Sequence, residues 1–358
     1  MEEERCWRAC CDLGFFYLDL REEVHGETLL EDAGRLFAVM RDLFLLPVGE
    51  KERFDFAEKG SYFGYKGCGR GIVDERGTRD GCEFYNVGGV YLYVFLGRNR
   101  KVIAHPCQIS KDDILRLVSQ IPCPDLLNHH RPLFETYIRA SHSLCMLITS
   151  LLSSRLSLNA NLKDAGDLST LHALDTPSGD QIRFVRAPPQ SPTKTAVAMG
   201  EHTDFGSVTI LFNRLGGLQV KLPHGIEPVA PPSSGQLDGC ENALTSGGWA
   251  YVKPLPGHCV VNLGDALVKF SGGRLRSNIH RVVPPPGEQA RCERYSLVYF
   301  CRPRNEVLLR SLIEGEGEQE GEGVTAEDWI LRRALGRRRA DGWKDSVGTE
   351  GVSMRAGM

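Results

Sequence analysis

The stretch GEHTDFGSVTILF, residues 200–212, decides how this chain folds and which chemistry it supports. His202 and Asp204 lie two residues apart in a segment that reads as extended, so both side chains point to the same side. A second histidine, His280 in SNIHR (277–281), begins another extended run far downstream. Two histidines and one carboxylate predict a catalytic non-haem Fe(II) site with open coordination positions. A His-x-Asp triplet alone is weak, because most such triplets bind nothing.

Arg294 and Ser296 strengthen this interpretation. They lie two residues apart at the start of the apolar run RYSLVYF (294–300), so they face the same way. A guanidinium offers a planar fork of N–H donors that fits a carboxylate, and the serine adds a hydroxyl donor. An arginine paired with a core carboxylate, or one at the surface, would explain the spacing equally well.

Short strand-like runs separated by glycine and proline turns fill the chain from residue 181 to 301. This texture predicts an all-β barrel or a double-sheet jelly roll. The runs are 182–186, 195–199, 207–212, 218–222, 249–252, 259–263, 280–283 and 295–301.

Helical periodicity occupies the flanks of this region. We expect helices at 28–46, 110–120 and 132–156, and a short strand at 14–20. A further helix is expected near 325–339, where Thr325 resembles a helix cap; its arginines (332, 333, 337, 338 and 339) read as a solvated face. We therefore divide the chain into a mixed helical region (1–175), a jelly-roll catalytic domain (176–305) and a polar linker, C-terminal helix and tail (306–358).

The overall charge is nearly balanced, with 43 Lys and Arg against 46 Asp and Glu in 358 residues. So weak a net charge, −3, does not favour nucleic acid or an anionic membrane as partner. The start, MEEER (1–5), is acidic where a secretory signal is basic and then apolar, so we expect a cytoplasmic protein. The 12 cysteines form no Cys-x-x-Cys pair and are expected to be reduced. We also expect a monomer.

Several segments together resemble the Fe(II)/2-oxoglutarate-dependent dioxygenases, in the branch related to isopenicillin N synthase. The resemblance spans residues 10 to 340 and implies a mainly β fold with flanking helices around a double-stranded β-helix, the cupin-like jelly roll. The matching segments are GFFY (14–17), GEHTDFGSVTILF (200–212), GGLQV (216–220), PGHCVVNLGDAL (256–267), FSGGRLRSNIHRVV (270–283) and RYSLVYFCRP (294–303).

The resemblance also assigns roles. His202, Asp204 and His280 become the iron ligands, and Arg294 and Ser296 hold the distal carboxylate of 2-oxoglutarate. The implied reaction uses dioxygen, decarboxylates 2-oxoglutarate to succinate, and hydroxylates or desaturates a small organic metabolite, such as one of secondary metabolism; ascorbate is expected to support it. The sequence does not identify this substrate. Its expected pocket residues are Phe300 and four side chains of the N-terminal half, namely Tyr62, Tyr65, Tyr85 and Asn86.

Two departures from the family pattern stand out. The chain lacks the Ile-Pro-x-Ile-Asp strand that usually opens such sequences. Ala187 in RFVRAPP (183–189) stands where a family tyrosine helps to hold 2-oxoglutarate, and Arg186 is a candidate to replace that contact. Two alternatives also stay open: an iron oxidase of isopenicillin N synthase type, independent of 2-oxoglutarate, and a jelly roll that binds a ligand without catalysis.

Overall fold

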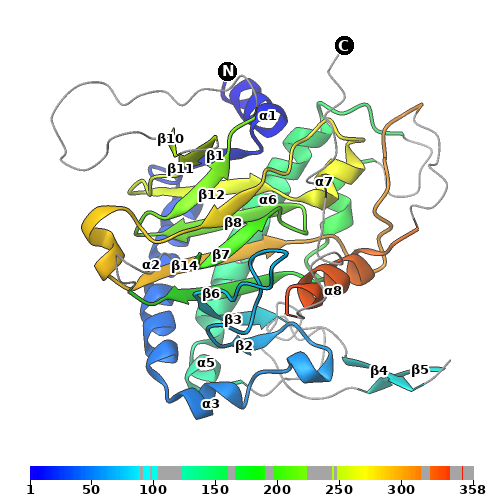
Figure 1. Cartoon of the computed structure of the whole chain (residues 1–358). Helices are drawn as coiled ribbons and strands as arrows, with labels where there is room; N and C mark the ends of the chain where they lie inside the picture. The colour runs from blue at the N-terminus through cyan, green and yellow to red at the C-terminus, as the bar shows by residue number, and fades with distance from the viewer. Residues whose placement is uncertain are drawn as a thin grey trace, which may run out of the picture.

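The computed structural model of this protein describes most of the chain (Figure 1). The helix expected at 110–120 and the first residues of the strand expected at 195–199 lie outside the described part. The described residues are 1–88, 92–96, 99–103, 123–159, 166–189, 197–223, 244–245, 248–315, 323–338 and 349.

The larger sheet contains seven antiparallel strands in the order β1-β12-β8-β14-β6-β3-β2. Its central strand β14 is buried along nearly its whole length, as its continuous apolar sequence requires. The strands are β1 Phe15–Asp19, β2 Gly64–Lys66, β3 Glu83–Gly88, β6 Gln181–Ala187, β8 Val208–Asn213, β12 His258–Leu263 and β14 Arg294–Cys301.

A smaller, five-stranded sheet has the order β10-β11-β9-β13-β7. With the larger sheet it forms the jelly roll, so the predicted fold class is confirmed. Its strands are β7 Met199–His202, β9 Leu218–Lys221, β10 Leu244–Thr245, β11 Trp249–Tyr251 and β13 His280–Val282, and a separate hairpin joins β4 Leu92–Leu96 to β5 Asn99–Ile103.

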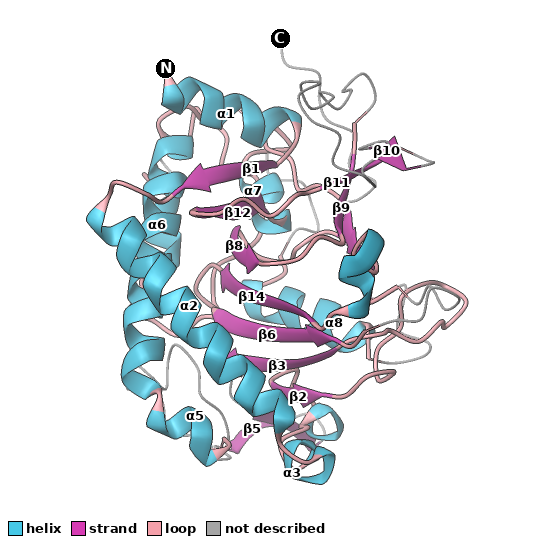
Figure 2. Cartoon of the chain, turned by 90° about the vertical axis from the view of Figure 1, so that its left-hand side faces the viewer, coloured by secondary structure: helices cyan, strands magenta, loops and turns pink. Residues whose placement is uncertain are grey.

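Two long helices cover one face of the larger sheet (Figure 2). Helices α2 (Val24–Leu45) and α6 (Arg131–Ser153) pack against each other and against β14. Apolar residues at three- and four-residue steps, such as Leu133, Tyr137 and Ile148, form the buried stripe of α6. The other face of the sheet is therefore the one that can open toward a ligand. The remaining helices are α1 Glu2–Asp12, α3 Val48–Glu52, α5 Asp125–His129, α7 Asp265–Phe270 and α8 Ala326–Gly336.

Two predicted boundaries shift. Helix α2 begins four residues earlier than expected, because the Glu23 side chain accepts a hydrogen bond from the Gly26 N–H and caps it. Strand β7 begins at Met199, where the predicted strand ended, and ends at His202. The candidate metal ligand His202 is therefore part of the strand, and Asp204 follows directly after it.

The interpretation of the C-terminal arginines as a solvated face was wrong for Arg333 and Arg338, whereas Arg332 is exposed and Arg339 lies outside the described residues. Arg333 is fully buried and forms an ion pair with the equally buried Asp265. Arg338 pairs with Asp55 at 2.9 Å. Sequence periodicity cannot show these contacts, because both carboxylates come from distant segments. Helix α8 is thus fixed to the jelly roll by charge.

None of the helices in the described part of the chain combines the length and apolar character that a bilayer span needs.

Candidate metal centre and active site

The structure brings His280 together with His202 and Asp204, from which it lies far away in the sequence. Their ligand atoms all lie within 4.8 Å of one another, and all three residues are buried. The antiparallel pairing of β13 with β7 sets His280 directly opposite His202, with ring centroids 4.2 Å apart. Sheet register therefore builds the cluster.

Hydrogen bonds orient both imidazoles in the same way. The Nδ1 atom of His202 lies 2.8 Å from the Gly200 carbonyl oxygen, and Nδ1 of His280 lies 3.1 Å from that of Asn278. A carbonyl can only accept, so each Nδ1 carries the proton and each Nε2 keeps its lone pair. The two Nε2 atoms lie 3.9 and 3.8 Å from the same oxygen, Oδ1 of Asp204. Two lone pairs and a carboxylate oxygen facing one another fit a divalent metal ion.

The two oxygens of Asp204 have different surroundings. Oδ2 accepts hydrogen bonds from Thr209 Oγ1 and Asn262 Nδ2, both at 2.6 Å. These two donors sit opposite each other on the paired strands β8 and β12. They hold the carboxylate so that Oδ1 faces the histidines.

Burial also favours the neutral form of His202. Loss of solvent, reinforced by His280 and Arg337, lowers the pKa of His202 well below its usual value. A neutral imidazole is the form that coordinates a metal ion.

Arg294 and Ser296 lie at the inner end of a pocket that also contains the three candidate ligands. Arg294 donates from Nε to the Gly216 carbonyl oxygen at 2.7 Å and from a terminal nitrogen to Ser296 Oγ at 2.6 Å. The positive φ of Gly217 belongs to the turn that presents this carbonyl. Among the described residues no carboxylate pairs with Arg294, although it is buried. Burial lowers its pKa to about 10, so the guanidinium is still charged at neutral pH and needs an anion.

Ala187 lies opposite Arg294 on the neighbouring strand β6 and lines the same inner pocket. No hydroxyl is available at this position. Arg186 does not replace the contact, because it lies outside the residues that line this pocket and forms ion pairs with Glu83 and Glu293. The side chains of adjacent strand residues point to opposite faces, which explains the separation.

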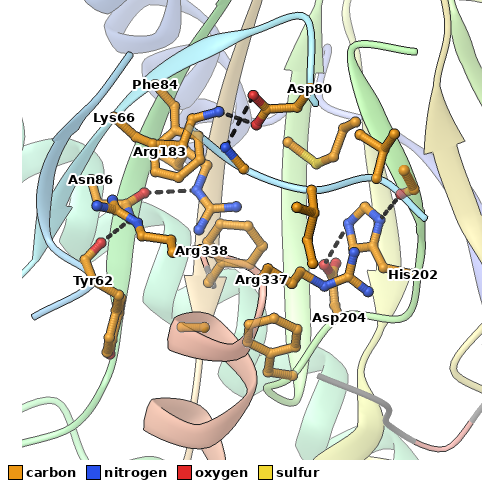
Figure 3. Close-up of a pocket in the computed structure, with 18 of the residues that line it drawn as sticks. Tyr62, Lys66, Asp80, Phe84, Asn86, Arg183, His202, Asp204, Arg337 and Arg338 are labelled. Carbon is orange, nitrogen blue, oxygen red and sulfur yellow. Dashed lines mark hydrogen bonds and ion pairs between the residues drawn. The ribbon is translucent and has the colours of Figure 1, made fainter. Parts of the chain in front are cut away.

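A second, outer pocket adjoins the inner one and is drawn in Figure 3. The two pockets share Arg183, Met199, His202, Asp204 and Phe300. Tyr62, Asn86 and Phe300, expected at the substrate pocket, line the outer one.

Tyr65 and Tyr85 were also expected at the substrate pocket, but neither lines the inner or the outer one. They pair across β2 and β3 and belong to the hydrophobic core, and the Tyr65 hydroxyl donates to Glu83 at 2.5 Å. Their neighbours Lys66, Phe84 and Asn86 line the outer pocket instead, as the alternation of side chains along a strand requires.

The sequence interpretation missed several side chains of this region. Thr209 and Asn262 left no signal, because their contact with Asp204 depends on sheet register. Arg183 did leave one: a charged residue inside the apolar run IRFV (182–185) demands a partner, as Arg294 does.

A second buried group, His142, Asp180 and Cys301, also has its ligand atoms within 4.8 Å of one another. The fold already uses these atoms: His142 Nε2 contacts the His172 carbonyl oxygen at 2.6 Å. Asp180 accepts hydrogen bonds from the Tyr299 hydroxyl and the Arg302 N–H. This group is a structural network.

Comparison with known proteins agrees with the geometry. The family model of the 2OG-Fe(II) oxygenase superfamily matches residues 179–303, and that of the non-haem dioxygenase in morphine synthesis N-terminal region matches residues 4–91. A 2-oxoglutarate-dependent dioxygenase of Aspergillus fumigatus is 30% identical over 87% of this chain and 74% of its own. Another, from a Dothideomycetidae species, is 29% identical over 92% of this chain and 83% of its own.

A solved structure shares the fold. It is a full-length Neurospora crassa protein in complex with alpha-KG and thymine, with a TM-score of 0.63 and 21% identity, over 93% of this chain and 90% of that one.

The chain belongs to the 2OG-Fe(II) oxygenase superfamily. It is an Fe(II)- and 2-oxoglutarate-dependent dioxygenase that couples decarboxylation of 2-oxoglutarate to succinate with oxidation of a small organic substrate.

Proposed function

We propose that His202, Asp204 and His280 hold the Fe(II) ion, and that Arg294 with Ser296 holds the distal carboxylate of 2-oxoglutarate. One observation carries this assignment: two imidazole Nε2 atoms face the same Asp204 oxygen, in a pocket that also contains a buried guanidinium with no carboxylate partner among the residues that the structure describes. The cluster of two imidazoles and the Asp204 carboxylate needs a cation, and the Arg294 guanidinium needs an anion.

The inner pocket is suited to orient 2-oxoglutarate. Arg294 is fixed at Nε by Gly216 and shares a hydrogen bond with Ser296, so its remaining donors have a defined direction. Apolar side chains, including Val185, Leu211 and Val298, line the space between this end and the metal ligands. They match the methylene groups of a dicarboxylic acid and exclude water from the site.

The outer pocket is the proposed position of the substrate. His202 and Asp204 line both pockets, so the metal position is reached from either side. When bound, Fe(II) and 2-oxoglutarate supply the oxidising power from dioxygen, and the protein supplies position and exclusion of water. The outcome, hydroxylation or desaturation, depends on which substrate carbon the outer pocket presents.

The first test measures succinate. Purified protein with Fe(II), ascorbate, 2-oxoglutarate and a panel of small metabolites is expected to form succinate. His202→Ala and Asp204→Ala are expected to abolish it and to lose bound iron, because each removes one of three ligands. Arg294→Met is expected to raise the KM for 2-oxoglutarate at least about tenfold, the loss expected for a charged hydrogen-bonded pair.

His258→Ala is the matched control, since His258 lies outside both pockets. Normal iron content in the Asp204→Ala protein would contradict the metal assignment, and an unchanged KM in Arg294→Met would contradict the co-substrate assignment. An oxidase independent of 2-oxoglutarate would consume dioxygen without forming succinate, and a binding protein would do neither.

A further inference from the structure

The outer pocket is strongly cationic in a chain of nearly neutral charge. Five basic side chains line it, and the acidic residues of its wall are Asp80 and Asp204 (Figure 3). Asp204 belongs to the proposed metal centre. The basic residues are Lys66, Arg183, Arg302, Arg337 and Arg338.

Two of these cations have acidic partners. Lys66 forms an ion pair with Asp80, whose Oδ1 atom also accepts the N–H groups of Gly69 and Gly71. Arg338 pairs with Asp55 at 2.9 Å. Their charges are therefore already balanced by the protein.

Arg183 has a fixed position, but no carboxylate in the described part of the chain forms an ion pair with it. Its Nε donates to Asn86 Oδ1 at 2.7 Å, and the Asn86 amide donates to the Tyr62 carbonyl oxygen at 2.6 Å. Its guanidinium carbon lies 4.6 Å from the ring centroid of Phe84 and 5.0 Å from that of Phe300. This holds the side chain between two rings. In Figure 3 it points into the pocket that His202 and Asp204 close on the other side.

The guanidinium carbon of Arg302 lies 5.3 Å from the centroid of the same Phe300 ring. Arg302 is buried, and its terminal nitrogen donates to the Gly179 carbonyl oxygen and to the Tyr62 hydroxyl. Within the described part of the chain no carboxylate forms an ion pair with Arg183 or Arg302. Burial, followed by the charge of Arg302, lowers the pKa of Arg183 to about 10, so its guanidinium remains charged at neutral pH.

Neither aromatic contacts nor 2-oxoglutarate accounts for this arrangement. A cation over an aromatic ring gains about 0.5–2 kcal/mol, whereas burial of an unpaired charge costs several kcal/mol. The distal carboxylate of 2-oxoglutarate has its own buried arginine, Arg294, at the inner pocket. Burial and Arg302 lower the pKa of Arg183, whereas Asp204 raises it, but the Asp204 carboxylate belongs to the proposed metal centre.

We propose that Arg183, supported by Arg302, binds a carboxylate of the substrate, so that the substrates of this enzyme are small organic acids. The inference rests on the proposed function and adds the substrate class. The acid group lies against the Arg183 guanidinium, near Phe84 and Phe300, and the carbon to be oxidised lies toward His202 and Asp204. The two rings favour an apolar or aromatic body next to the acid group.

The test uses matched acids and amides. Full-length protein with Mn(II) in place of Fe(II) is saturated with 2-oxoglutarate and titrated calorimetrically with benzoate, phenylacetate and 3-phenylpropionate, and with the three corresponding amides. We expect at least one acid to bind about tenfold more tightly than its amide, because the amide lacks the charge. Arg183→Gln is expected to remove this preference; because Arg183 also lines the inner pocket, the affinity of this variant for 2-oxoglutarate is measured as well.

Arg186→Gln is the matched control, because it removes an arginine from the same strand that faces away from the pocket; it is expected to keep the preference. Arg183→Lys retains the charge and is expected to keep part of the preference for acids over amides. The titrations are repeated without 2-oxoglutarate. If 2-oxoglutarate does not bind, the proposed function is contradicted, and these repeats still measure the preference for acids over amides. Equal binding of acids and amides, binding of no acid, or a loss of 2-oxoglutarate affinity in Arg183→Gln would each overturn the inference.

Discussion

Asp204 shows how a single carboxylate is oriented to act as the metal ligand that we propose. Its Oδ2 atom accepts from Thr209 and Asn262, while its Oδ1 atom faces the two histidines. Because one oxygen is held by two short hydrogen bonds, the other has little freedom to turn away. Partners of this kind, which orient a ligand without touching the metal, typically affect metal affinity 10–100-fold.

We therefore expect Asn262→Ala to weaken Mn(II) binding about 10- to 100-fold while the protein stays folded. The measurement is a calorimetric titration of metal-free protein in the presence of 2-oxoglutarate. Asn278→Ala is the control, because Asn278 is equally buried and contacts His280 only through its backbone oxygen. Equal affinities of the Asn262 and Asn278 variants would show that the hydrogen bond to Asp204 has no orienting role.

At this scale the sequence could predict the metal ligands but not their supports. His202, Asp204 and His280 are recognisable from residue type and spacing. Thr209 and Asn262 are ordinary strand residues whose contact with Asp204 arises only when β8 pairs with β12 in one register. Such contacts depend on tertiary structure, so no local pattern reveals them.

Helix α8 illustrates the same limit at the scale of an element. Its position and its Thr325 cap are visible in the sequence, and the Thr325 hydroxyl does accept the Asp328 N–H. Its role is not visible, because Arg333 contacts Asp265 and Thr203, which follow different strands of the jelly roll. Thr203 stands between His202 and Asp204, so α8 supports the backbone of the metal centre.

Replacing Arg333 by methionine is expected to lower the free energy of unfolding by about 3–5 kcal/mol, because it leaves Asp265 buried without its cation. Urea unfolding followed by tryptophan fluorescence measures the change. Arg332→Met is the matched control, since Arg332 is exposed on the same helix; we expect a change within about 0.5 kcal/mol. Similar losses of unfolding free energy in both variants would contradict a specific stabilising role for the ion pair between Arg333 and Asp265.

For the whole molecule, the near-neutral total charge hides an uneven distribution. The acidic residues balance most basic ones, yet the buried Arg302 and Arg294 and the partly buried Arg183 line the two pockets without carboxylate partners among the described residues. Composition alone suggested no anionic ligand, because it reports the sum of the charges and not their placement. An enzyme that binds one or two organic acids can keep such cations, since its ligands complete the charge balance.

Two fully buried arginines of this chain should therefore differ in how much their replacement destabilises the ligand-free protein. Arg333 has its carboxylate in the protein, whereas the carboxylate proposed for Arg294 arrives with 2-oxoglutarate. We expect Arg294→Met to lower the free energy of unfolding of the ligand-free protein by no more than about 1 kcal/mol, roughly the loss of its hydrogen bond to Gly216.

Ligand addition completes this comparison. With Mn(II) present, 2-oxoglutarate at 100 times its dissociation constant is expected to stabilise the unaltered protein by about 2.7 kcal/mol, and the same concentration should stabilise Arg294→Met far less. The measurement is the same urea unfolding series with and without 2-oxoglutarate, with Arg332→Met as the variant that keeps the full gain. A ligand-free loss in Arg294→Met as large as that in Arg333→Met would mean that the protein itself satisfies Arg294, which would leave 2-oxoglutarate without its proposed anchor.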